Sequence, residues 1–200
     1  MEIREIKARF DDKSIRVYQA YGREIAVAAL KNNRFVSPFR MERMTWIKPS
    51  FNWMMYRSGY AKKPGQEYVL AIDIHREGFD WAVDNAVLSH FVPEIHGNYD
   101  NWKVLLASSE VRVQWDPARD WRISEIAGER AIQIGLSKNA VQKYVNEWII
   151  SITDVTSVAH AIDESRRLKQ EPNKRPDLLE RVYEMSETAR LKLCSGINQS

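Results

Sequence analysis

The sequence predicts an α+β protein, a single domain with a small mixed or antiparallel sheet and several helices. The 200 residues suit one medium domain, and 44% hydrophobic residues with seven Trp indicate a folded core. Runs with the two-residue alternation of strands are interleaved with helical runs early in the chain, and helical spacing dominates from residue 138 onward. No internal repeat marks a second domain, so we expect an α+β core over residues 1–169.

The first two elements follow one another directly. Residues 14–21, SIRVYQAY, alternate apolar and polar side chains and are rich in strand-forming residues, which predicts a β-strand. The next run, GREIAVAALKNNRF, has apolar residues at helical spacing and predicts a helix that ends at Asn32 and Asn33.

Residues 49–59 predict a second helix. Pro49 suits its first turn and Gly59 its end. Four side chains between them share one face at helical spacing and predict a buried stripe: Phe51, Met54, Met55 and Ser58.

The middle of the chain predicts three more strands. The near-continuous apolar run EYVLAIDIHR indicates a strand at the centre of a sheet, and the run FDWAVDNAVL predicts a short helix after it. Residues 90–102 are polar and turn-rich and predict a loop. The alternating run SSEVRVQWDPARDW then predicts a half-buried strand that Asp116-Pro117 ends, and RAIQIGLS predicts a further short strand.

The last third of the chain is expected to be helical. Helical spacing covers residues 138–170, and the segment QEPNKRPD at 170–177, with two prolines and no apolar residue, predicts a linker. A final helix over 178–193 is expected to dock on the body, within a C-terminal helix and tail over 178–200. The one cysteine, Cys194, is expected to lie outside the ordered body as an inert thiol.

The composition also bears on the compartment. No window approaches the roughly eighteen consecutive apolar residues of a membrane span, and the charged N-terminus lacks the apolar core of a signal peptide. We therefore expect a cytoplasmic protein that does not associate with membranes. The single cysteine excludes an internal disulfide and a thiolate metal cluster.

Positive charge is concentrated near the N-terminus. Residues 1–60 hold twelve Lys and Arg against six Asp and Glu, within a net charge of +3 for the whole chain. Because cationic surfaces attract phosphates, the expected partners are NAD or another nucleotide, or RNA or DNA. A solvated charged face without a partner is the alternative.

Several polar residues are candidates for chemistry, although the standard catalytic and phosphate-binding motifs are missing. Three glutamines lie within predicted strands, where they either line one cleft or point separately to solvent: Gln19, Gln114 and Gln133. Glu110 opens a strand and is a candidate acid or base, whereas Asp116 before a proline is more typical of a turn. No ligand spacing indicates a metal, so a metal-dependent hydrolase using Glu110, Asp116 and His96 ranks third among the hypotheses.

Four segments carry a resemblance to a known family: VYQAYGREIAVAAL, MTWIKPSFNWMMYRSG, VQWDPARD and RAIQIGL. At these segments the sequence closely resembles the family catalogued as domain of unknown function 4291 (DUF4291). The resemblance runs from about residue 5 to residue 190. The name of that family implies no function.

The order of the predicted elements also resembles the ADP-ribosyltransferase superfamily. Its first strand typically reads Tyr-His or Tyr-Arg before a helix, and its catalytic glutamate lies on a later strand; Tyr18-Gln19 and Glu110 match these positions. The resemblance implies an NAD-binding enzyme that modifies a nucleic acid or a protein, with Gln19 at the nicotinamide ribose. It further implies that Glu110 stabilises an oxocarbenium-like transition state, with Gln114 as the fallback for that role. A Gln in place of His or Arg carries no charge, which departs from the pattern.

Under that resemblance, the aromatic and cationic stretch at residues 43–59 forms the wall of the NAD site. The residues expected to stack on a base or to face the pyrophosphate are Arg43, Trp46, Lys48, Trp53, Tyr56 and Arg57, together with Tyr18 on the strand. The same rings and cations suit the alternative function, a non-catalytic module that binds single-stranded nucleic acid.

Overall fold

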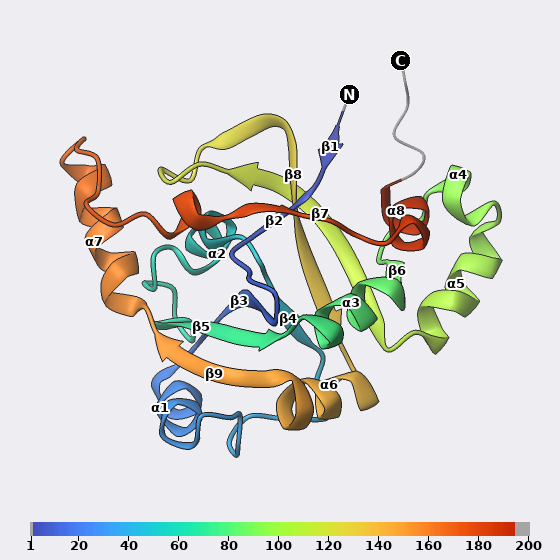
Figure 1. Cartoon of the computed structure of the whole chain (residues 1–200), viewed down its shortest axis with the longest axis horizontal. Helices are drawn as coiled ribbons and strands as arrows, with labels where there is room; N and C mark the ends of the chain where they lie inside the picture. Colours follow the sequence, from blue (N-terminus) through green and yellow to red (C-terminus); the bar gives the residue numbers. More distant parts are fainter. Residues whose placement is uncertain (1, 195–200) are drawn as a thin grey trace.

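The structure, a computed structural model that describes residues 2–194, confirms the α+β class. Its strands form three sheets, and its helices are distributed so that α7 lies at one end of the molecule and α4 and α5 at the other (Figure 1). The α-helices are α1 (Arg23–Asn32), α2 (Phe51–Ser58), α3 (Arg76–Asp84), α4 (Pro93–His96), α5 (Tyr99–Ser108), α6 (Asn139–Lys143), α7 (Thr156–Arg167) and α8 (Glu187–Cys194).

The first sheet has three antiparallel strands. Its order is β3-β5-β9, formed by β3 (Ser14–Tyr21), β5 (Tyr68–His75) and β9 (Ile149–Asp154). The predicted central position of β5 is confirmed, and it buries most of its side chains because it pairs on both edges and helices pack near it.

The second sheet is mixed and has five strands: β1 (Ile3–Arg4), β4 (Thr45–Ile47), β6 (Ala86–Leu88), β7 (Val111–Arg119) and β8 (Glu125–Leu136). The long strands β7 and β8 pair antiparallel, and β6 pairs parallel with β7. On the outer edge of β8, β1 pairs parallel with one end and β4 antiparallel with the other. The predicted mixed sheet is therefore confirmed.

The first and second sheets meet at a main-chain junction between Tyr18 and Lys48. The Tyr18 amide of β3 donates to the Lys48 carbonyl at 2.7 Å, and the Lys48 amide donates back to Tyr18 at 3.2 Å. The third sheet is small and pairs β2 (Ile6–Ala8) with β10 (Arg181–Tyr183). The Tyr18–Lys48 junction brings Gln19 beside the strand β4, and this position determines the floor of the candidate site.

The helix α2 begins and ends through local capping. Ser50 Oγ accepts a hydrogen bond from the Trp53 amide at 3.4 Å, and Gly59 adopts the left-handed region at φ 60° after the last turn. Pro49 thus precedes the cap residue and does not occupy the first turn as predicted. The predicted stripe of Phe51, Met54, Met55 and Ser58 is buried.

The predicted stop of the first helix is confirmed. Asn33 caps α1 in the left-handed conformation at φ 48°. Its side-chain oxygen accepts from the Ile152 amide at 2.8 Å, which fixes the end of α1 to the edge strand β9.

The predicted helix over residues 138–170 is wrong in its middle. The chain is helical in α6 and through a π-helical turn at Tyr144–Trp148, but it then extends into β9 and becomes helical again only in α7. Pairing of Ile152 with Ile72 explains the difference, since a long-range sheet edge overrides helical spacing in a β-branched segment.

Pro117 does not end its strand. The strand β7 continues to Arg119, with a shift of register between Pro117 and Arg119. β6 pairs only with residues Val111 to Val113, so the opposite edge of β7 has no strand partner at Pro117 within the described residues. A proline without an amide hydrogen is tolerated at such a free edge.

Two further regions differ from the prediction. The expected loop over 90–102 contains α4 and the start of α5, and α3 begins at Arg76 with β6 following it. In the C-terminal segment, the expected helix over 178–193 is divided into a 3-10 turn (Pro176–Leu179), β10 and α8. Sheet pairing of β10 with β2 accounts for this division.

The C-terminal segment runs back across the molecule after α7 and ends with α8 beside β6 (Figure 1). Cys194 closes α8 and is half-buried, with its Sγ 3.8 Å from the Arg4 carbonyl oxygen, so the prediction that it lies outside the body is wrong. In the expected linker, Arg175 forms ion pairs with Glu171 and Asp177. The boundaries at 169 and 177 stay a prediction, and residues 195–200 lie outside the described residues.

Candidate functional site

A pocket of about 630 Å³ opens beside the junction of the two sheets. Its walls come from the end of β3, the loop before β4, β4 itself, α2 and the turn before β5. The residues that line it are Gln19, Ala20, Tyr21, Ile25, Pro38, Phe39, Arg40, Arg43, Met44, Thr45, Trp46, Lys48, Met54, Arg57, Pro64, Gly65 and Gln66.

The floor of the pocket is a hydrogen-bonded group centred on Gln19, which is only 2% exposed. Its amide nitrogen donates to Thr45 Oγ1 at 2.5 Å and to the Tyr21 hydroxyl at 2.9 Å. Its amide oxygen accepts from the Tyr144 hydroxyl at 2.8 Å. Because both ends of the carboxamide are satisfied by the protein, Gln19 forms a fixed polar floor.

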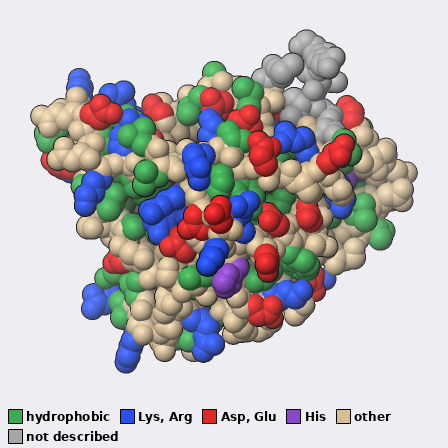
Figure 2. Space-filling view, viewed as in Figure 1, with side chains coloured by type: hydrophobic (Ala, Val, Ile, Leu, Met, Phe, Trp, Pro, Cys, Tyr) green, Lys and Arg blue, Asp and Glu red, His purple; other side chains and the backbone are tan. Residues whose placement is uncertain are grey.

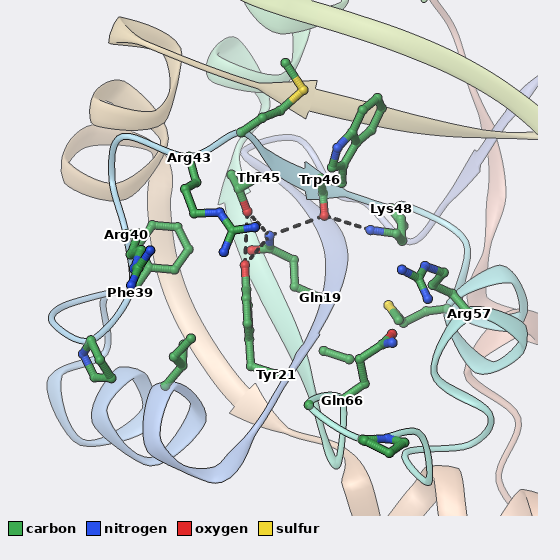
Figure 3. Close-up of a pocket in the computed structure, with 17 residues that line it drawn as sticks. Gln19, Tyr21, Phe39, Arg40, Arg43, Thr45, Trp46, Lys48, Arg57 and Gln66 are labelled. Atoms are coloured by element: carbon green, nitrogen blue, oxygen red, sulfur yellow. Dashed lines mark hydrogen bonds between the residues drawn. The ribbon is translucent and has the colours of Figure 1, made fainter.

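Four cationic side chains surround the space above this floor: Arg40, Arg43, Lys48 and Arg57. They come from the loop before β4, the end of β4 and α2, and Figure 3 shows Arg43 on one side of the hollow with Lys48 and Arg57 on the other. No Asp or Glu is among the described residues that line the pocket. Within residues 2–194, none of these four cations forms an ion pair with a carboxylate.

On one face of the molecule, positive charge is mixed with negative charge. Figure 2 shows Lys and Arg interspersed with Asp and Glu over the face of the molecule that is viewed in Figure 1. The positive surplus of residues 1–60 therefore forms no single-sign patch over that face. In the pocket, by contrast, four cationic side chains without an ion pair among the described residues line one cavity.

Lys48 is the one buried cation of the pocket, at 7% exposure. Its Nζ donates to the Trp46 carbonyl oxygen at 2.9 Å. Burial and, to a lesser extent, the nearby charge of Arg57 lower the pKa of Lys48 to about 7, while Asp116 acts in the opposite direction. The amine is thus close to half neutral at neutral pH.

A second polar cluster lies on the face of the five-stranded sheet. Gln133 donates through its amide nitrogen to Gln114 Oε1 at 2.8 Å and to Asp116 Oδ2 at 2.7 Å. Burial raises the pKa of Asp116 above its ordinary value, although the Gln133 hydrogen bond and Lys48 oppose this effect. Gln114 and Gln133 therefore meet, but Gln19 belongs to a different group, so the three glutamines do not line one cleft.

The pocket brings together five of the predicted site residues: Gln19, Arg43, Trp46, Lys48 and Arg57. The structure does not bring Glu110 or Gln114 into the lining. Glu110 precedes β7, and its carbonyl oxygen accepts from the Ser137 amide at 2.8 Å. The resemblance to ADP-ribosyltransferases assigns Gln19 and Glu110 to one active site, and the pocket lining contains Gln19 but not Glu110.

The remaining predicted residues lie outside the pocket for packing reasons. Tyr18 is 2% exposed and packs edge-on against Phe51 at a centroid distance of 5.4 Å. Trp53 is 5% exposed because its indole packs in a small cluster with Ala118 and Ala131. Tyr56 is 40% exposed, but Arg119 covers its ring at 4.1 Å.

Sequence reasoning missed part of the lining, chiefly Phe39, Arg40 and Gln66. Phe39 and Arg40 lie in the irregular segment between α1 and β4, where no periodic pattern marks them. The available signal was charge alone, since Arg40 belongs to the basic surplus of residues 1–60.

The residues of the third hypothesis do not form a metal site. His96 Nδ1 lies 3.0 Å from the main chain of Val92, and Asp116 is bonded to Gln133. Across the described part of the chain, no three His, Cys, Asp or Glu residues lie close enough to hold a metal ion.

No helix within the described residues has both the length and the apolar composition that crossing a bilayer requires.

The fold and the pocket define an α+β protein with a cationic cavity, partly lined by aromatic side chains, at the junction of two sheets. The chain belongs to the family named domain of unknown function (DUF4291), whose model matches residues 5–183. No curated protein matches it. Neither comparison supports the resemblance to ADP-ribosyltransferases.

Proposed function

We propose that this protein binds a nucleotide that carries a diphosphate, with NAD as the first candidate, in the pocket above Gln19. One observation carries this proposal: three arginines and the partly charged Lys48 surround a cavity, and no carboxylate is among the described residues that line it. Unpaired cations in one place repel each other, and a bound polyanion removes that repulsion.

The chemistry of the cations fits a diphosphate. The guanidinium groups of Arg40, Arg43 and Arg57 are exposed at the rim and can each offer paired donors to phosphate oxygens. A base or nicotinamide has flat apolar surface to meet in the same cavity, where Phe39 and Trp46 form part of the wall. The volume of about 630 Å³ is of the size that small-molecule sites have.

Transfer of ADP-ribose is the further part of the proposal. It requires a carboxylate near the ribose, and that group has to come from outside the lining residues. Release of nicotinamide from NAD, measured over hours with the purified protein, tests this part separately from binding. The proposal places the reaction in the cytoplasm, where NAD is available.

The alternative is a module for single-stranded nucleic acid. Such modules stack successive bases on exposed aromatic rings. Here Trp53 is buried and the Tyr56 ring is covered by Arg119, so the number of free stacking surfaces is small. A calorimetric titration decides between the two functions, because binding of a single strand and of a dinucleotide can be compared on one protein sample.

The test is calorimetric titration with NAD, ADP-ribose, inorganic diphosphate, adenosine and a single-stranded decanucleotide. We expect NAD and ADP-ribose to bind and adenosine to bind much more weakly. Replacing Arg43 or Arg57 with Ala is expected to weaken binding by about tenfold, the effect of losing one charge-assisted hydrogen bond.

The matched control is Arg34→Ala, since Arg34 is exposed and lies outside the pocket lining. Its affinity for NAD is expected to equal that of the unchanged protein. No binding of NAD, ADP-ribose and diphosphate would overturn the proposal. Binding of the decanucleotide alone would favour the alternative.

A further inference from the structure

Lys48 occupies an unusual position for a lysine. Its main chain is hydrogen-bonded to Tyr18 in both directions at the sheet junction, so the base of the side chain is held firmly. The side chain is 7% exposed, yet it lines the pocket, and Figure 3 shows its nitrogen directed toward the Trp46 carbonyl at the edge of the hollow.

The surroundings of its nitrogen suit an amine better than an ammonium ion. An ammonium group has three N–H donors, and with the described residues the side chain of Lys48 makes a single hydrogen bond, to the Trp46 carbonyl oxygen at 2.9 Å. No carboxylate lies within ion-pair distance of it among the described residues. The groups that face it are the cation Arg57 from α2, the ring of Trp53 at 5.8 Å and the carboxyl group of Asp116 from β7.

Burial and the charge of Arg57 favour the neutral amine, whereas Asp116 and the ring of Trp53 favour the ammonium ion, and burial is the largest of these effects on the pKa. With a pKa of about 7, close to half of the Lys48 side chains carry a free electron pair at pH 7. A lysine at its ordinary pKa near 10.4 is neutral in only about one molecule in 2,500 at that pH. A desolvated amine beside a second cation is the arrangement that activates lysine as a nucleophile.

We propose that Lys48 forms an imine with the aldehyde carbon of a phosphorylated reducing sugar, such as ADP-ribose, whose phosphates are held by the arginines of the pocket. This inference rests on the proposed function, because the same cations anchor the ligand. The Nζ electron pair attacks the aldehyde carbon and the C=O π bond breaks. The resulting carbinolamine loses its hydroxyl group and the nitrogen's proton as one water molecule, which leaves a C=N bond and needs no oxidant or reductant.

The substrate class follows from combining the two features. The cations select phosphates, and the amine selects a ligand with a free anomeric carbon, which opens to an aldehyde. ADP-ribose has both features. NAD has the same diphosphate, but its nicotinamide ribose has no free anomeric carbon because that carbon is bonded to nicotinamide. A comparison of NAD with ADP-ribose therefore distinguishes binding through the phosphates from reaction with the amine.

The experiment traps the imine. The full chain is incubated with ADP-ribose at pH 7.5, reduced with sodium borohydride and analysed by intact mass and peptide mapping, with NAD in a parallel sample. We expect one adduct at Lys48 with ADP-ribose and none with NAD, and excess NAD is expected to suppress the adduct. The yield at Lys48 is expected to exceed that at any exposed lysine by at least about tenfold.

Two variants and a pH series sharpen the result. Lys48→Arg is expected to abolish the adduct, whereas Lys63→Arg, which removes an exposed lysine outside the pocket lining, is expected to leave it unchanged. The yield at Lys48 is expected to level off above about pH 8, while the yield at exposed lysines continues to rise toward pH 10. Peptide mapping of the unchanged protein decides the question even if Lys48→Arg does not fold.

The outcomes separate the two proposals. Binding of both nucleotides without an adduct at Lys48 would overturn the imine and leave the nucleotide site intact. Adducts spread evenly over exposed lysines would overturn it as well. If neither NAD nor ADP-ribose binds, both proposals are overturned together.

Discussion

The Tyr144 hydroxyl donates a hydrogen bond to Gln19 Oε1 at 2.8 Å, across 125 positions of the chain. Both residues are buried, and this bond joins the π-helical turn before β9 to the strand β3. It satisfies the only acceptor of the Gln19 carboxamide while Thr45 and Tyr21 take the donors. The floor of the pocket is thus built from residues of three distant segments.

We therefore expect Tyr144→Phe to lower the free energy of unfolding by about 1–3 kcal/mol, because it leaves a buried amide oxygen without a donor. Urea unfolding measures this loss. Tyr99→Phe serves as the control, since Tyr99 is 50% exposed, and its change is expected to stay within about 0.5 kcal/mol. Equal losses in the two variants would show that the Tyr144–Gln19 bond contributes nothing specific.

The parts of the fold that the sequence predicts are those with a strong local pattern. The strand β3 follows from alternation and the strand β5 from a near-continuous apolar run. The helices α1 and α2 follow from helical spacing and from the end residues Asn33 and Gly59. The strand β9 was predicted as helix because its identity depends on pairing with β5, which lies almost eighty positions earlier in the sequence.

The same distinction applies to the candidate site. Arg43, Trp46, Lys48 and Arg57 were predicted because rings and cations are concentrated in one short stretch of sequence. Glu110 was grouped with Gln19 by the resemblance to a superfamily, and the lining of the pocket does not contain it. Whether a strand residue faces a particular cavity depends on tertiary pairing, which a single sequence does not encode locally.

The position of Cys194 leads to a prediction about the C-terminal helix. Its thiol is half-buried at the end of α8, and burial raises its pKa above the ordinary value for cysteine. Because the thiolate is the reactive form, we expect the native protein to react with a disulfide reagent at least about tenfold more slowly than the protein in urea. Equal rates in the two conditions would mean that α8 does not dock as described.

The lowered pKa of Lys48 predicts how stability depends on pH. Between the folded value of about 7 and the ordinary value near 10.4, the unfolded chain binds more protons at this position than the folded chain. The unfolding free energy of the unchanged protein, relative to Lys48→Met, is therefore lowest below pH 7 and rises with pH across that window. Each unit of difference in pKa corresponds to about 1.4 kcal/mol, so the rise amounts to a few kcal/mol at most.

Urea unfolding of both proteins between pH 6 and pH 9 measures this difference. Lys63→Met is the control, since Lys63 is exposed, and its difference from the unchanged protein is expected to be flat over the same range. A flat difference for Lys48→Met would show that the amine keeps its charge in the folded state, which would also remove a support of the imine proposal.

Gly135 lies close against one wall of the pocket. A Cβ atom at this residue would lie 2.9 Å from Trp46 Cζ2 and 3.0 Å from Met44 Sδ, and both of these residues line the cavity. We expect Gly135→Ala to displace the Trp46 indole, to lower the free energy of unfolding by about 1–3 kcal/mol and to weaken NAD binding several-fold. The matched control is Gly78→Ala, where the new Cβ would lie 2.4 Å from Trp148 Cγ, away from the lining of this pocket. Both variants are expected to lose stability in urea, and only Gly135→Ala to lose affinity in calorimetry. A similar loss of affinity in both would mean that Trp46 has no particular part in binding.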